Sequence, residues 1–314
     1  MMSYIIRRLL AFIPTLFAIS FLVFLLLYFV PGDPAQMMLG VDATRAAIEE
    51  LHVDLGLDQP FHTRLLNWYG KALTGDLGRS YYLARTVVEA ISERIPVTLQ
   101  LTTLSLLVAI FIGVPSGMIA AVRQNGPLDA LIMGGAMLGL TIPGFLVGLL
   151  LIYFIALPTG WFPTGGYVPF FQAPLESLRS LALPALSLGL AQAALIARMT
   201  RSSMLEVLRL DYVRTARAKG LRERVVVTRH VLANSLIPII TVVGIVAGVL
   251  LGGAIAIETV FTLPGVGLLV ISAVERRDYP LIQGVILFIT IIYLVVNLLV
   301  DLLYVAVDPR IRYS

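Results

Sequence analysis

Residues 198–230 read RMTRSSMLEVLRLDYVRTARAKGLRERVVVTRH and separate two long apolar segments of the chain. They contain nine Lys or Arg residues and three acids, a net charge of +6 in a chain whose total is +4. Within them, the sequence of residues 211–220 predicts a short helix that ends at a glycine. A basic segment of this kind between two apolar spans is typical of a cytoplasmic loop. The helix inside it suggests that the loop binds a soluble partner protein.

The composition is that of an integral membrane protein. Charged residues make up 13% and hydrophobic residues 58% of the 314 residues, which excludes an ordinary soluble domain. A helix needs about 20 apolar residues to cross a bilayer. We therefore expect an all-α protein with six transmembrane helices, the fourth only 17 residues long. These uncharged segments are 9–30, 97–122, 130–157, 181–197, 231–257 and 281–300.

The distribution of basic residues predicts the orientation of the spans. With the N-terminus inside, the cytoplasmic segments carry a net charge of +9 and the outer segments −4. Both termini are then cytoplasmic, and the first span is too long for a cleaved signal peptide. The predicted organisation is an N-terminal anchor helix (1–30), an extracytoplasmic helical segment (31–96), a transmembrane core (97–308) that carries the loop 198–230, and a tail (309–314).

The segment 31–96 has its own helical patterns. Thr44 is a predicted N-cap for a helix to Leu55, with Gly56 as its stop. A second helix, 60–73, places Phe61, Leu65, Leu66 and Tyr69 on one face, and a third covers 86–94.

Motifs for nucleotide hydrolysis, metal binding or nucleophilic catalysis are missing from the sequence. There is no P-loop, no H-x-x-x-H pair for a metal and no G-x-S-x-G nucleophile, and the chain has no cysteine. We therefore expect no enzymatic activity, no cofactor and no metal, which leaves transport. Ion-coupled carriers place ionisable groups in their spans. The only candidate is Asp301, which we interpret as a structural carboxylate at a helix end, so the energy source is expected in another polypeptide.

Motifs along the whole chain resemble the dipeptide/oligopeptide/nickel permeases of ABC importers. ABC importer permeases in general have a coupling motif that reads E-A-A, three further residues and Gly. This chain matches that motif only in part. Arg214 and Thr215 replace its first two residues, while Ala216 and Gly220 match. The match to the peptide branch lies in residues 31–34, 75–78, 198–201, 211–220, 264–267, 277–280 and 308–310, and in His230, Asn234 and Pro238.

The resemblance implies a type I ABC importer in the bacterial inner membrane. This chain would pair with a second homologous permease, two ATPase subunits that bind ATP and Mg²⁺, and an extracytoplasmic substrate-binding protein. It would contact lipid but no nucleic acid. The implied substrate is a short peptide or a glutathione-like molecule; nickel or another small solute remains an alternative within the family.

The coupling contact is predicted at the helix in the basic loop. Asp211 can cap this helix, Gly220 can turn the chain at positive φ, and the small side chains of Ala216 and Ala218 would let the helix enter a groove of the ATPase. Basic side chains would surround the contact. The predicted coupling residues are Asp211, Tyr212, Arg214, Thr215, Ala216, Arg217, Ala218, Lys219 and Gly220.

Several alternatives remain open from the residues alone. The chain could be an ion-coupled carrier or channel, or a non-transporting scaffold that recruits a soluble partner, and the basic loop could serve topology only. Small and kinking residues in the spans either line a pathway or allow close helix packing. These residues are Gly139, Pro143, Pro238 and Gly248.

Overall fold

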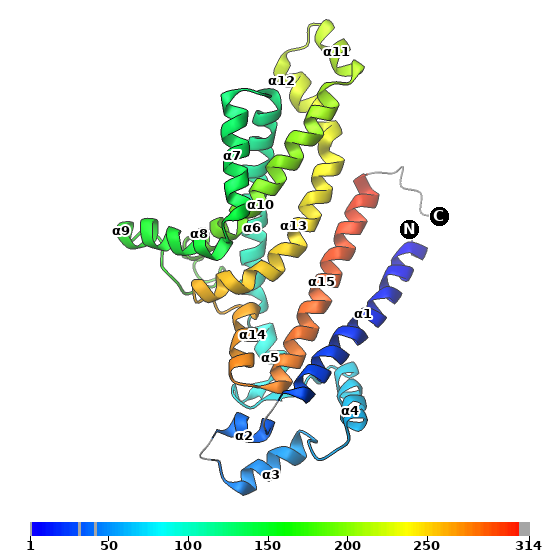
Figure 1. Cartoon of the computed structure of the whole chain (residues 1–314), viewed down its shortest axis with the longest axis vertical. Helices are drawn as coiled ribbons and strands as arrows, with labels where there is room; N and C mark the ends of the chain where they lie inside the picture. The colour runs from blue at the N-terminus through cyan, green and yellow to red at the C-terminus, as the bar shows by residue number, and fades with distance from the viewer. Residues whose placement is uncertain (1, 31–32, 41–42, 308–314) are drawn as a thin grey trace. The chain divides into compact units, whose positions relative to one another are not determined.

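The computed structural model describes residues 2–30, 33–40 and 43–307 (Figure 1). The predicted motif at 308–310, the tail 309–314 and the first half of the motif 31–34 lie outside these residues. The chain forms two compact units. Among the described residues, one unit comprises those up to Pro96 together with Gly265–Val295, and the other comprises Val97–Pro264 together with the residues from Val296 onward.

Five described helical segments are long and apolar enough to cross a membrane, and a bent pair brings the number to six if it counts as one span. This agrees with the predicted all-α membrane fold. The principal helices of these spans are α1 (Met2–Phe29), α6 (Ile95–Val122), α10 (Pro174–Leu208), α13 (Ala233–Val260) and α15 (Tyr279–Val307).

The prediction of one continuous span over 130–157 is wrong. Helix α7 (Pro127–Thr141) ends before Pro143, and the chain resumes as α8 (Gly144–Leu151) after a bend of 102°. Proline lacks an N–H group and forces the preceding residue out of the helical region, and Ile142 accordingly has φ −81° and ψ 124°. Figure 1 shows α8 running away from the direction of α7. Two short stretches, η1 (Ile152–Ala156, π-helical) and α9 (Leu157–Thr159), follow α8.

The fourth span is much longer than its 17 apolar residues. Helix α10 has 35 residues and includes residues 198–208, which we had predicted as part of the loop. Burial does not stop at Arg198, because Ser203 and Met204 on the basic extension are still buried. The sequence becomes more polar from Arg198 because the surroundings of the helix change there, but the helix itself continues.

Small residues bring α6 and α10 into close contact in the second unit. A Cβ atom on Gly113 would lie 2.7 Å from the backbone oxygen of Ala193, and one on Gly189 would lie 2.7 Å from that of Ser105. Gly117 faces the backbone oxygen of Ala197 in the same way. Helix α10 also packs against α13, α7 and α8, so it is the central helix of this unit.

The first unit contains the three helices predicted for 31–96, and four elements that were not predicted. Thr44 caps α3 (Arg45–Asp54), α4 covers Phe61–Leu73, and Thr86 with Glu89 forms a capping box at α5 (Val87–Ser92). One face assignment on α4 is wrong: Leu66 is 67% exposed. The further elements are α2 (Pro34–Leu39), the antiparallel strands β1 (Arg79–Ser80) and β2 (Arg85–Thr86), and α14 (Val266–Glu275).

Two motifs far apart in sequence meet in this unit. The buried carboxylate of Asp278 accepts a hydrogen bond from the Ser80 hydroxyl at 2.6 Å and from the Tyr82 amide at 3.3 Å. Its other oxygen accepts from the amide of Leu281 at 3.2 Å, at the start of α15. The motif 277–280 therefore fixes the hairpin that follows the motif 75–78.

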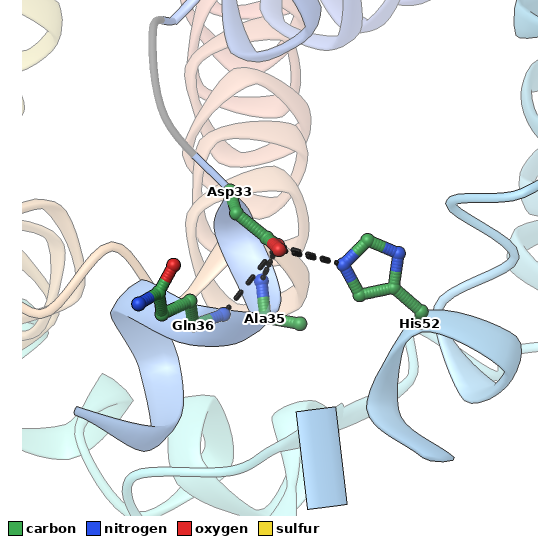
Figure 2. A network of polar contacts seen from close by, with 4 residues as sticks. All are labelled: Asp33, Ala35, Gln36 and His52. Atoms are coloured by element: carbon green, nitrogen blue, oxygen red, sulfur yellow. Dashed lines mark hydrogen bonds and ion pairs between the residues drawn. The ribbon is translucent and has the colours of Figure 1, made fainter. Parts of the chain in front are cut away.

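Asp33 has a comparable role at the start of α2 (Figure 2). Its carboxylate accepts hydrogen bonds from the amides of Ala35 and Gln36. The Nε2 atom of His52, in α3, lies 2.8 Å from the Oδ1 atom of the same carboxylate. Burial raises the pKa of Asp33, but the bonds from His52 and the backbone outweigh it, so the pKa lies below its usual value. Asp33 thus ties α2 to α3.

Candidate coupling site and membrane core

The predicted helix of the basic segment is present as α11 (Asp211–Ala218). Figure 1 shows it beyond the ends of the long helices α10 and α13 of its unit. Its Val213 and Ala216 are buried in an apolar cluster with Met204 of α10 and with Val226 and Val231. The last two residues belong to the π-helical stretch η2 (Val226–Leu232), which follows the short helix α12 (Glu223–Val225) and continues into α13. Packing on both sides holds α11 on the ends of α10 and α13.

The C-terminus of α11 is closed by a Schellman motif. The amide of Gly220 donates to the oxygen of Arg217 at 2.9 Å, and the amide of Leu221 donates to the oxygen of Ala216 at 3.4 Å. Gly220 has φ +77°, a conformation in which side chains are strained, and no atom lies within 4 Å of the place of a Cβ. The predicted turn is confirmed. Glycine is favoured at position 220 because of its positive φ, since a side chain there would meet no neighbouring atom.

The predicted cap at the other end is wrong. Leu210 is the N-cap and offers no side-chain hydrogen bond, while Asp211 is the first helical residue and is solvent-exposed. Its carboxylate lies 3.6 Å from the Arg214 guanidinium. A negative charge in the first turn still favours the helix through its dipole.

The prediction for Ala216 is also wrong. Ala216 is 6% exposed and faces its own chain, so it cannot enter a groove of a partner. With three to four residues per turn, positions 213 and 216 share the inner face, and the remaining predicted positions lie outside it. The exposed predicted residues are Asp211, Tyr212, Arg214, Thr215, Arg217, Ala218, Lys219 and Gly220.

Polar contacts fix α11 to the segment that follows. Arg217 makes a two-pronged ion pair with Glu223 of α12, at 2.6 and 3.1 Å. The Tyr212 hydroxyl donates to the backbone oxygen of His230 at 3.4 Å, and the Asn234 amide donates to the same oxygen at 2.6 Å. The backbone oxygen of His230 therefore contributes to the attachment of α11, and Asn234 shares this acceptor, which the spacing of the two residues in the sequence did not reveal.

Comparison with known proteins gives the family. Residues 113–313 match the binding-protein-dependent transport system inner membrane component, and residues 1–102 match the N-terminal region of such membrane components. The chain belongs to this permease family. Two relatives align over all 314 residues and over their own full length. A Brucella abortus (strain 2308) protein that bears a peptide transport system permease name is 42% identical, and the glutathione transport system permease GsiC of Escherichia coli K12 is 44% identical.

A solved structure agrees on the fold. A chain of the inward-facing methionine ABC transporter MetNI superposes with a TM-score of 0.57 at 19% identity, covering 69% of the permease and 95% of that chain. The family match and the full-length relatives make the permease a multi-pass membrane subunit of an ABC importer. Its family implies ATPase subunits and a substrate-binding protein as partners. This is the assignment that the sequence motifs predicted.

An ion pair that sequence reasoning missed stabilises the membrane core of the permease near α11. Asp129, in the first turn of α7, accepts from Arg201 of α10 through Nε at 2.6 Å and through the second guanidinium nitrogen at 2.7 Å. It also accepts from the amide of Asn125 at 2.9 Å. The side chains are only 6% and 24% exposed. Arg201 lies in the motif 198–201, but nothing in the sequence identified Asp129 as its partner.

The candidate pathway residues of the permease have different surroundings. Pro143 and Pro238 are exposed, and Gly139 is half-buried, 3.4 Å from Ala194 by its Cβ position. Gly248 is buried within its unit. The exposed residues could contact either lipid or a partner subunit, and pathway lining stays a prediction for all four residues. Among the described residues no group of three or more His, Cys, Asp or Glu side chains could hold a metal ion.

Proposed function

We propose that the permease imports short peptides or glutathione-like molecules and forms its pathway together with a second, related permease. The full-length identity of 42–44% to permeases named for peptide and glutathione transport supports this substrate class. Uptake of labelled glutathione and of di- and tripeptides by cells with and without the intact gene tests it. Loss of peptide uptake on deletion is expected. Loss of nickel uptake alone would contradict the peptide assignment.

The central element of the proposal is that α11 docks into an ATPase subunit. The observation that carries it is the division of α11 into two faces. Val213 and Ala216 anchor the helix on its own chain, while Arg214, Ala218 and Lys219 face outward. A helix anchored on two long spans can pass a push on its outer face to both of them, as rigid-body switching requires. Around the small Ala218 the basic side chains would set the orientation of the contact.

Energy supply and topology complete the proposal. ATP and Mg²⁺ bind to the ATPase subunits, and the permease itself hydrolyses nothing and holds no cofactor. In the bacterial inner membrane both of its termini face the cytoplasm. A reporter fused after Arg217 is expected to be cytoplasmic, and one inserted at Thr44 external. An external reporter after Arg217 would overturn the coupling role as well.

Charge reversal on the outward face tests docking. Arg214→Glu and Ala218→Trp should both abolish ATP hydrolysis stimulated by the substrate-loaded binding protein, because one reverses the charge and the other fills the contact. Arg123→Glu is the matched control, since Arg123 is an exposed basic residue between α6 and α7. Equal stimulation in Arg214→Glu and the control, with normal copurification of the ATPase, would refute the docking role.

A further inference from the structure

A cavity of about 750 Å³ lies within the first unit and is unused by the proposed coupling mechanism. One wall is the C-terminal end of α1, where Phe24, Leu27 and Tyr28 belong to the last turns of an apolar span. The rest of the lining comes from residues between 53 and 86, which include α4, and from the first turn of α15. A cavity at this end of a span lies at the depth where lipid headgroups meet hydrocarbon, and aromatic side chains favour that region.

Three hydrogen-bond donors of the cavity wall have no partner among the described residues. They are Arg64 Nε, Trp68 Nε1 and the Tyr279 hydroxyl, and each of these atoms is buried. Tyr279 as a whole residue is only 7% exposed. Buried donors are normally satisfied, so three unpartnered donors in residues that line one cavity favour an acceptor group bound there.

Arg64 determines the charge of that group. Its guanidinium lies 5.8 Å from the centre of the Phe24 ring, and no described carboxylate forms an ion pair with it. Burial lowers the pKa of Arg64, and the Tyr28 and Tyr279 hydroxyls partly offset this effect. An arginine guanidinium nevertheless keeps its positive charge in proteins. A half-buried arginine without a counter-ion favours an anion that offers several oxygens.

Other charges on the wall do not supply this anion. Asp76 accepts from the amide of Gly78 at 2.9 Å, and Asp54 accepts from the Tyr81 hydroxyl at 3.5 Å. Lys71 and Arg79 add further positive charge to the lining. Cations thus outnumber acids around the cavity, and the two acids are directed at other donors.

We propose that this cavity binds the phosphate group of an anionic membrane phospholipid. Arg64 faces the phosphate, a rotation of the Trp68 and Tyr279 side chains brings their N–H and O–H donors to its oxygens, and Leu27 with Phe24 contacts the first carbons of the acyl chains. Phosphate suits the site because it presents several acceptor oxygens to donors from different directions. Lipid is the source because one wall is a membrane span.

Lipid titration of the purified importer tests the site. The delipidated complex in neutral detergent is titrated with phosphatidylglycerol and followed by native mass spectrometry. Arg64→Gln is expected to weaken phosphatidylglycerol binding about tenfold or more, since it removes a charge-assisted contact. Arg45→Gln, which removes an exposed arginine on α3, should leave binding unchanged. Trp68→Phe keeps an aromatic side chain and removes the indole N–H donor, so it should give an intermediate loss in a protein that remains folded.

Competition separates the sources of the anion. Phosphatidylcholine, whose phosphate carries its own cation, should bind more weakly than phosphatidylglycerol, and inorganic phosphate or a tripeptide should not displace the lipid. Equal binding of phosphatidylglycerol by Arg64→Gln and Arg45→Gln would overturn the proposal. Displacement by millimolar inorganic phosphate or by the tripeptide would overturn the lipid as the occupant.

Discussion

Breaking the ion pair between Asp129 and Arg201 should destabilise the permease far more than breaking a surface pair. In Asp129→Ala the guanidinium of Arg201, three-quarters buried, loses both short contacts, and the amide of Asn125 loses its acceptor. Removing one partner of a buried ion pair costs about 3–5 kcal/mol. For a domain of this size such a loss lowers the unfolding midpoint by roughly 6–20 °C.

The matched control is the pair of Arg85 with Glu93, which has the same 2.6 Å separation but side chains that are 44% and 57% exposed. Glu93→Gln should cost about 1 kcal/mol or less, because water screens exposed charges. The assay is thermal unfolding of the purified complex at one detergent and salt concentration. In the double variant Asp129→Ala, Arg201→Leu, part of the loss should be recovered, since no buried charge is then left unpaired. If Asp129→Ala costs no more than Glu93→Gln, the reasoning about burial is refuted.

Four further outcomes are expected. Gly220→Val should lower uptake and Gly220→Asn should retain more of it, because Asn tolerates positive φ; equal uptake by the two would contradict this. Gly117→Ala should reduce the yield of folded protein through its clash with α10, whereas Gly134→Ala, with open space around it, should not; size-exclusion profiles compare them. The pKa of Asp33 is lower in the folded protein than the usual Asp pKa of about 3.9, so its carboxylate stabilises the fold above that pH, and this stability is lost as the pH falls through the folded-state pKa. Hydrogen exchange corrected for pH should therefore increase in α2 only below about pH 4. Asp301→Asn should keep most uptake at constant expression, since we interpret this carboxylate as structural; a severe defect in fully assembled complex would show that it acts in transport.

Sequence reasoning succeeded where one segment carries its own signal. Apolar length predicted where the membrane-spanning segments lie, although not the bend at Pro143 or the full length of α10, and Thr44 and Gly56 predicted the ends of a helix that the structure contains. Residues 211–220 predicted α11 and its glycine turn, because a helix stop at positive φ is a local property of the backbone. The motifs spread along the chain were sufficient for the family.

Tertiary structure decided what depends on neighbours far along the chain. The burial of Ala216 follows from its contact with α10 and η2, which no local pattern around it specifies. Asp129 and Arg201 are 72 positions apart, and only the packing of α7 on α10 makes them partners. The same holds for the cavity at Arg64, whose walls come from three separate stretches of the chain. A helix stop at a glycine is set by residues within a turn or two, whereas burial and charge pairing are set by which helices pack together.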